Sequence, residues 1–124
     1  MDVPILQQGD VLIASVQSDL SDIQVTRLRD ELTTLVGSSR ATGVIVNVSG
    51  MDVIDSFTAR LLRSIAEAAR MRGAMTYVVG IRPEVAIALV HFDVDLAPIR
   101  TALDLDEAMR LLGQRPARPA SHGD

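Results

Sequence analysis

The sequence of 124 residues contains neither cysteine nor lysine. Without cysteine, no disulfide can stabilise the fold and no thiol can act as a nucleophile or metal ligand. All 12 basic residues are arginine, so a phosphate-binding P-loop lysine, a lysine Schiff base and a lysine general base are excluded as well. Because these absences remove several classes of enzyme, we expect a protein without catalytic activity, cofactor or metal ion.

Aromatic residues and positive charge are scarce too. The chain has one tyrosine, two phenylalanines and no tryptophan, and its formal net charge is -4. A nucleic-acid partner is not expected, since such proteins present basic patches and stacking aromatics. No apolar run approaches the roughly 20 residues that cross a bilayer, and the N-terminus lacks a basic region followed by an apolar one. We therefore expect a cytoplasmic protein with no membrane partner.

Hydrophobic residues make up 48% of the chain, enough for the core of one domain of this length. Beyond Gly113 the sequence is rich in proline, arginine, alanine and glycine and has no apolar periodicity. The expected organisation is one domain over residues 1–113, followed by a disordered tail at 114–124.

Apolar periodicity predicts secondary structure in the order β-β-α-β-α-β-α-(β)-α. Strands are expected at 3–6, 11–16, 44–48 and 75–79, with a weak one at 96–99. Helices are expected between Ser21 and Gly37, between Ser56 and Gly73, at 84–90, and between Asp104 and Gly113. The first two strands form a hairpin, and the strands from 44–48 onward are parallel. This order predicts an α/β fold: a mixed β-sheet with an N-terminal hairpin and about four helices packed mainly on one face.

Helix boundaries carry specific signals. Ser21 and Gln24 have the spacing of a capping box, and Asp104 and Glu107 repeat it. Gly37 fits the position just after a helix end. The segment 84–90 is short and apolar, which predicts a mostly buried helix.

The candidate site follows the strand at 44–48, whose apolar run is typical of a central parallel strand. Asp55 and Ser56 stand where the next helix begins, and either side chain could cap it. If Asp55 caps, the hydroxyl of Ser56 is left facing solvent. Asp52 and Asp55 could instead form a metal-binding or phosphoryl-accepting pair, but turn and capping roles are favoured because the chain lacks lysine. His91 has no partner at recognisable spacing and is interpreted as a helix-end residue.

Four stretches carry a family resemblance: V-P-I-L near the start, M-D-V-I-D-S-F at 51–57, G-I-R-P-E-V-A at 80–86 and T-A-L-D-L at 101–105. Over about residues 3–112 the chain resembles the RsbS family of STAS-domain proteins from bacterial stressosomes. Anti-sigma-factor antagonists with this domain typically place a small residue or glycine soon after the phosphorylated serine, whereas Ser56 is followed by Phe57. Ala88 stands where many relatives carry threonine, so no second phosphorylation site is expected there.

The resemblance implies a STAS domain at 1–113 that acts as a non-enzymatic stressosome scaffold and negative regulator of stress signalling. It would sequester an RsbT-type serine/threonine kinase, assemble with RsbR-type paralogues, and release the kinase when Ser56 is phosphorylated. The implied partner surface comprises Asp52, Asp55, Ser56, Phe57 and Thr58. Thr58 is the weaker candidate for phosphorylation, because it lies inside the first helical turn.

Two alternative functions remain open. The chain could be an anti-sigma-factor antagonist that binds an anti-sigma kinase through the same serine, or a small nucleotide-binding or phosphotransfer enzyme. The missing lysine and cysteine argue against the enzyme.

Strands 3–6 and 11–16 carry no lysine or inward charge to protect a sheet edge. We therefore expect at least a homodimer, and a larger particle with an RsbR-type partner.

Overall fold

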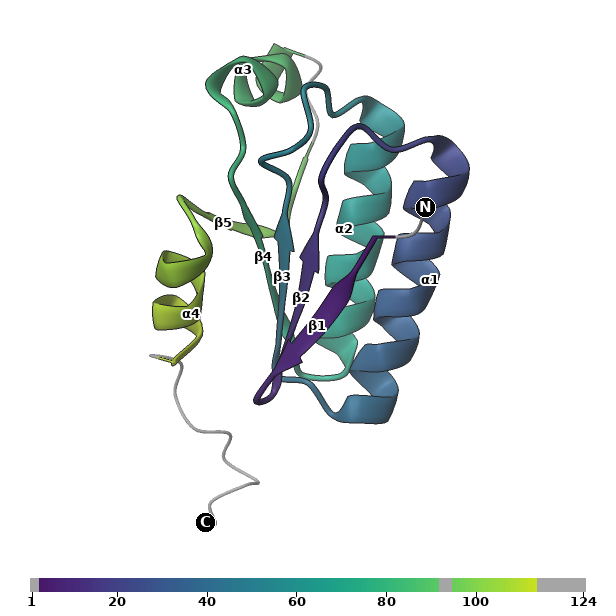
Figure 1. The fold of residues 1–124 in the computed structure, drawn as a ribbon, viewed down its shortest axis with the longest axis vertical. Coiled ribbons are helices and arrows are strands. Elements are labelled where there is room, and N and C mark those ends of the chain that lie inside the picture. The colour runs from purple at the N-terminus through teal and green to yellow at the C-terminus, as the bar shows by residue number, and fades with distance from the viewer. Residues whose placement is uncertain (1–2, 92–94, 114–124) are drawn as a thin grey trace.

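The computed structural model describes residues 3–91 and 95–113 (Figure 1). Within them the elements follow the predicted order. They are β1 (Ile5–Gln8), β2 (Val11–Ser15), α1 (Asp22–Ser39), β3 (Gly43–Asn47), α2 (Ser56–Met71), β4 (Met75–Val79), α3 (Pro83–His91), β5 (Arg100–Ala102) and α4 (Leu105–Gly113). The tail predicted at 114–124 and the side chains of Ala88 and His91 lie outside the described part of the chain.

The five strands form one mixed sheet in the order β1-β2-β3-β4-β5. β1 and β2 form the predicted antiparallel hairpin, and every later pairing is parallel. Ser15, Asn47 and Val79 lie in register at the carboxyl ends of β2, β3 and β4. The loops that follow these three strands therefore emerge at the same edge of the sheet.

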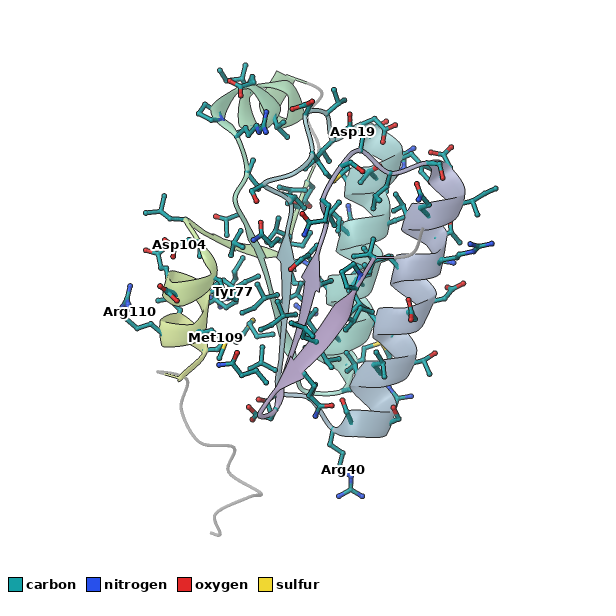
Figure 2. The ribbon with its side chains drawn as sticks, in the orientation of Figure 1. Asp19, Arg40, Tyr77, Asp104, Met109 and Arg110 are labelled. Carbon is teal, nitrogen blue, oxygen red and sulfur yellow. The ribbon has the colours of Figure 1, made fainter. Side chains whose placement is uncertain are left out.

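Helices cover both faces of the sheet (Figure 1). α1 and α2 lie side by side on one face, α4 packs on the opposite face, and α3 lies beyond the carboxyl ends of the parallel strands β2, β3 and β4. The side chains of β3 alternate accordingly: Val44 and Val46 belong to the core beneath α1 and α2, while Ile45 belongs to the core beneath α4. Tyr77 and Met109 lie between the sheet and α4 (Figure 2). The predicted α/β fold, a mixed sheet with four helices, is confirmed. The helices are not packed mainly on one face, however, because the second apolar face of the sheet is covered by α4.

The start of α1 agrees with the sequence signal and its end does not. Gln24 N donates to Ser21 Oγ at 3.2 Å, and Ser21 N donates to Gln24 Oε1 at 2.9 Å, so the capping box is present. However, α1 continues past Gly37 to Ser39, and Arg40 adopts the left-handed conformation at φ 55°. A Cβ on Gly37 would lie 3.0 Å from the guanidinium group of Arg72. The prediction that Gly37 ends the helix was wrong, because the left-handed residue that ends α1 is Arg40, and Gly37 instead lies within the helix beside the Arg72 side chain.

The segment from α3 to β5 differs from two predictions. α3 begins at Pro83, but Val85 is its one buried residue within 83–87, and the side chain of Ile87 is 69% exposed. Over the described side chains, 83–87, the expected burial is not found, since α3 lies at the end of the sheet and Val85 is the residue of this stretch that joins the core. The last strand is at Arg100–Ala102 rather than 96–99, where Leu96 and Ile99 pack against the core from a loop.

α4 turns one side toward the sheet, where Ala108 and Leu112 are buried. Asp104 Oδ1 accepts a hydrogen bond from Glu107 N at 2.9 Å, as expected of the cap. The Glu107 carboxylate accepts from Leu103 N at 2.8 Å rather than from the Asp104 backbone. None of the described helices combines the length and apolar character that crossing a membrane requires.

Candidate functional site

At the start of α2, one residue caps the helix and the next residue is exposed to solvent. Asp55 has extended backbone angles, and its Oδ1 accepts a hydrogen bond from Thr58 N at 2.8 Å, so Asp55 is the N-cap. Ser56 is the first helical residue and is exposed. Its hydroxyl makes no hydrogen bond to any part of the chain that the structure describes. Asp55 thus holds the helix start while the neighbouring hydroxyl faces solvent, as the sequence allowed.

Asp55 is also electrostatically suited to its position. The hydrogen bond from the Thr58 backbone N–H lowers the pKa of the Asp55 carboxyl below its usual value, and the Thr58 side chain and the charge of Arg60 act in the same direction. The carboxylate is therefore ionised at neutral pH. A negative charge at this point also complements the positive end of the helix dipole.

The residues of the predicted partner surface differ in how far they are exposed to solvent. Asp52, Asp55 and Ser56 are exposed, and Phe57 is half-buried. Thr58 is only 4% exposed. Two residues along a helix correspond to a rotation of about 200°, which turns Thr58 toward the core when Ser56 faces outward. Burial therefore corrects the prediction that Thr58 belongs to the partner surface.

The loop between β3 and α2 is bonded to the loops on both sides of it. Arg82 Nη1 lies 2.6 Å from Asp52 Oδ1, and Arg82 Nη2 donates to Ser49 O at 3.3 Å. From the other side, Asp19 Oδ1 accepts hydrogen bonds from Asp52 N at 2.8 Å and Val53 N at 3.3 Å. The β2–α1, β3–α2 and β4–α3 loops thus fix the residues that precede Ser56.

Asp19 and Arg82 were not singled out from the sequence, because each lies about 30 residues from the loop that it supports. One signal could have found them. Each of the two residues comes shortly after a predicted strand of the same sheet. The carboxyl ends of strands that run parallel meet at one edge of the sheet, so residues that follow such strands can lie close together.

The turn after β3 packs tightly on the neighbouring loop. A Cβ on Gly50 would lie 2.5 Å from the carbonyl oxygens of Val16 and Gln17. Those contacts are with backbone atoms, which cannot rotate away as a side chain can. Gly50 is therefore required by close approach rather than by a special backbone angle.

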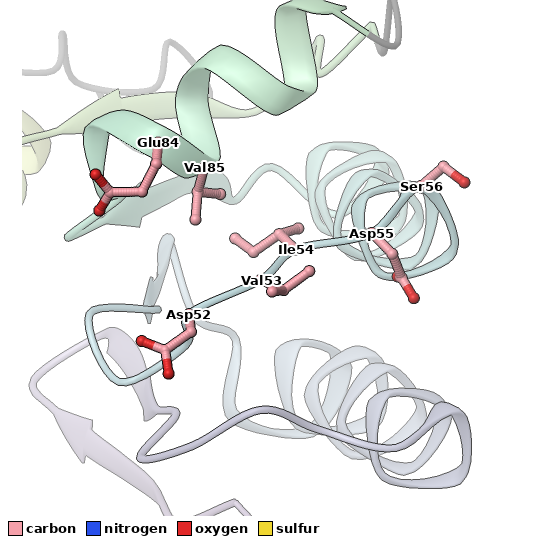
Figure 3. A pocket seen from close by; sticks show the side chains of 7 residues that line it. All are labelled: Asp52, Val53, Ile54, Asp55, Ser56, Glu84 and Val85. Atoms are coloured by element: carbon pink, nitrogen blue, oxygen red, sulfur yellow. The ribbon is translucent and has the colours of Figure 1, made fainter.

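An open groove of about 330 Å³ lies between the β3–α2 loop and the first turn of α3 (Figure 3). Ile54 and Val85 are buried at its base, at 5% and 3% exposure, and Val53 is 62% exposed. Figure 3 shows Ser56 at one end and Glu84 at the other, with the apolar side chains between them. The full lining is Asp52, Val53, Ile54, Asp55, Ser56, Glu84 and Val85.

Both carboxylates of the site that could have bound a metal ion have structural roles. Asp52 is paired with Arg82 and Asp55 caps α2, which agrees with the turn and capping roles favoured from the sequence. In the described part of the chain, histidine and acidic side chains form no cluster of three or more that could bind a metal ion. The arrangement presents a solvent-facing hydroxyl beside an apolar groove with an acidic rim.

A family model described as the STAS domain matches residues 2–108. The chain belongs to the STAS-domain family. This STAS domain is 24% identical over 108 residues to the RsbT co-antagonist protein RsbRA of Bacillus subtilis (strain 168). The match covers 87% of the chain and 39% of RsbRA, so the chain spans about two fifths of the length of that relative.

Solved structures of STAS proteins resemble this STAS domain over most of its length. A serine-to-glutamate variant of Moorella thermoacetica RsbS is 30% identical, with a TM-score of 0.79 over 90% of this chain and 94% of that chain. A structure described as the molecular architecture of the stressosome, a signal integration and transduction hub, is 28% identical. Its TM-score is 0.73, and the match covers 89% of this chain and 96% of that chain. The resemblance to RsbS drawn from short motifs is confirmed.

Proposed function

We propose that this STAS domain is a non-enzymatic cytoplasmic scaffold that sequesters an RsbT-type serine/threonine kinase and releases it when Ser56 is phosphorylated. The observation that carries the proposal is the exposed hydroxyl of Ser56, left free because Asp55 caps α2. Similarity to RsbS, and to a relative named as an RsbT co-antagonist, supports a kinase of this type as the partner. By holding the kinase, the protein acts as a negative regulator of stress signalling.

Phosphorylation at this position would change the surface without opening the helix. A phosphate adds about -1.5 to -2 charge at pH 7, and at a helix N-terminus this charge meets free N–H groups and the positive end of the helix dipole. A partner packed on Ser56 and Phe57 would then have to desolvate the phosphate. Asp52 and Asp55 already carry negative charge on this surface, and the phosphate would add to it. The modified face would therefore be more acidic than the face that the kinase first bound.

Phosphopeptide mapping tests the assignment of the switch. After incubation with an RsbT-type kinase and ATP, we expect the phosphate on Ser56 and none on Thr58, which is buried. Ser56→Ala should abolish incorporation. Ser49→Ala removes an exposed serine of the loop that precedes α2 and should leave incorporation unchanged. A phosphate that maps to any residue other than Ser56 would contradict the proposed switch.

Assembly with RsbR-type STAS proteins is the second part of the proposal. β1 is an edge strand, and the side chain of Leu6 on it is 66% exposed. Edge strands without lysine or inward-pointing charge are prone to pair with another chain. Contacts of this kind leave Ser56 accessible, because it lies beyond the carboxyl ends of the strands rather than along β1.

Sedimentation measures the expected assembly. At tens of micromolar we expect at least a homodimer, and a much heavier species after an RsbR-type protein is added. A monomer of 13.4 kDa that gains no mass with the RsbR-type protein would exclude the scaffold. In that case the alternative, an anti-sigma-factor antagonist that acts through the same serine, would replace it.

A further inference from the structure

The groove beside Ser56 combines an apolar base with unbalanced negative charge. Val53 is 62% exposed above the buried side chains of Ile54 and Val85. Asp55 and Glu84 lie on the rim. Of the cations nearby, Arg82 is bonded to Asp52 and Arg60 acts on Asp55 at the other end of the groove from Glu84. Within the described residues Glu84 has neither a hydrogen-bond nor an ion-pair partner. A bound segment would therefore find an apolar contact and an unpaired carboxylate side by side.

Charge decides between a second copy of the chain and a different partner. In a two-fold contact the same patch occurs on both subunits, so the acidic rim of one copy would face the acidic rim of the other. Like charges placed opposite one another cost free energy, and the whole chain is acidic at a net charge of -4. A segment that carries an arginine or lysine next to an apolar side chain complements both features of the groove.

Geometry separates this docking position from the phosphorylated residue. In Figure 3 the side chains of Ser56 and Glu84 lie at opposite ends of the groove and point away from each other. A segment seated over Val53 and Val85 would leave the Ser56 hydroxyl open to an active site. Docking and phosphoryl transfer can thus use neighbouring but different surfaces.

From these observations we infer that the groove between the β3–α2 loop and the first turn of α3 is a docking site for a basic segment of the kinase. An apolar side chain of that segment packs on Val53 and Val85, and an adjacent arginine or lysine pairs with Glu84. Glu84 is then a residue that determines partner specificity. This inference rests on the proposed function, because the kinase is the partner that must reach Ser56.

Charge reversal with a matched control tests the inference. Glu84 is the second residue of α3 and Asp106 is the second residue of α4; both helices have nine residues, and both side chains are exposed. By calorimetry with the RsbT-type kinase, we expect Glu84→Arg to weaken binding about tenfold or more, with a smaller salt dependence than the wild type. Asp106→Arg should change the dissociation constant by less than about twofold, because Asp106 does not line the groove and α4 packs on the face of the sheet opposite α1 and α2.

A second variant addresses the apolar part of the groove. Val53→Ser changes an exposed side chain, so folding should survive, and thermal melting checks this for all three variants. We expect Val53→Ser to weaken kinase binding several-fold and to raise the KM for phosphorylation of Ser56 while kcat stays unchanged. Such a split indicates a docking contact rather than a contact with the reacting atoms.

The outcomes distinguish this inference from the proposed function. If the wild-type protein neither binds the kinase nor is phosphorylated on Ser56, the proposed function fails. If the wild type binds and is phosphorylated but Glu84→Arg and Val53→Ser behave like it, the docking site is overturned. If Val53→Ser weakens binding while Glu84→Arg does not, the basic partner segment is overturned.

Discussion

The Ser56→Asp variant is expected to bind the kinase about a hundredfold more weakly than the wild type, or worse. The added carboxylate would stand at the start of α2 beside Asp55, on a face whose rim also includes Asp52. A partner that covers Ser56 would have to desolvate this charge, and a loss of a few kcal/mol corresponds to a factor of about a hundred or more in affinity. Calorimetry with the purified kinase measures the effect.

Two further variants at the same residue separate charge from shape. Ser56→Asn matches aspartate in size without its charge and should bind far more tightly than Ser56→Asp. Ser56→Ala should bind like the wild type and keep the kinase after ATP is added. If asparagine weakens binding as much as aspartate does, the effect is steric, and a charge switch at Ser56 is excluded.

The Gly50→Ala variant should have the largest effect on stability, a loss of about 3 kcal/mol or more in the free energy of unfolding. Its Cβ would lie 2.5 Å from backbone atoms of Val16 and Gln17, so the turn after β3 would have to move. That movement would also disturb the hydrogen bonds from Asp52 N and Val53 N to Asp19. Urea unfolding followed by circular dichroism measures the change.

Gly113→Ala is the matched control for this substitution. Gly113 is the last residue of α4, and a Cβ there would have no atom within 4 Å. We expect its free energy of unfolding to stay within about 1 kcal/mol of the wild type. If Gly50→Ala were no less stable than Gly113→Ala, the close packing of the two loops would be refuted.

The parts of the fold that were predicted correctly depend on neighbours in the sequence. The apolar run of β3 and the capping box of Ser21 and Gln24 each involve residues within a few positions of one another. The sequence also placed the start of α2 at Asp55 and Ser56, although it left open which of the two caps the helix. Such local preferences persist in the folded chain when tertiary contacts do not oppose them.

The parts that the sequence did not predict depend on contacts between distant segments. Gly37 is a residue type that often follows a helix end, yet it lies inside α1, where the guanidinium group of the distant Arg72 approaches it. The apolar sequence of α3 indicates burial, yet its position at the end of the sheet leaves Ile87 exposed. The groove was missed for the same reason, since Glu84 joins the β3–α2 loop only through the topology of the sheet.

The division of roles between Asp55 and Ser56 has a consequence for reversibility. The side-chain cap of α2 is provided by Asp55, so the neighbouring Ser56 hydroxyl is not needed to hold the start of the helix. A group attached there and later removed would leave the same backbone before and after, without a refolding step in between. In a particle built from many copies, each copy could then change its own surface without straining its neighbours. If the proposed scaffold holds its kinase through unmodified copies alone, the number of kinases held would fall in step with the number of modified copies.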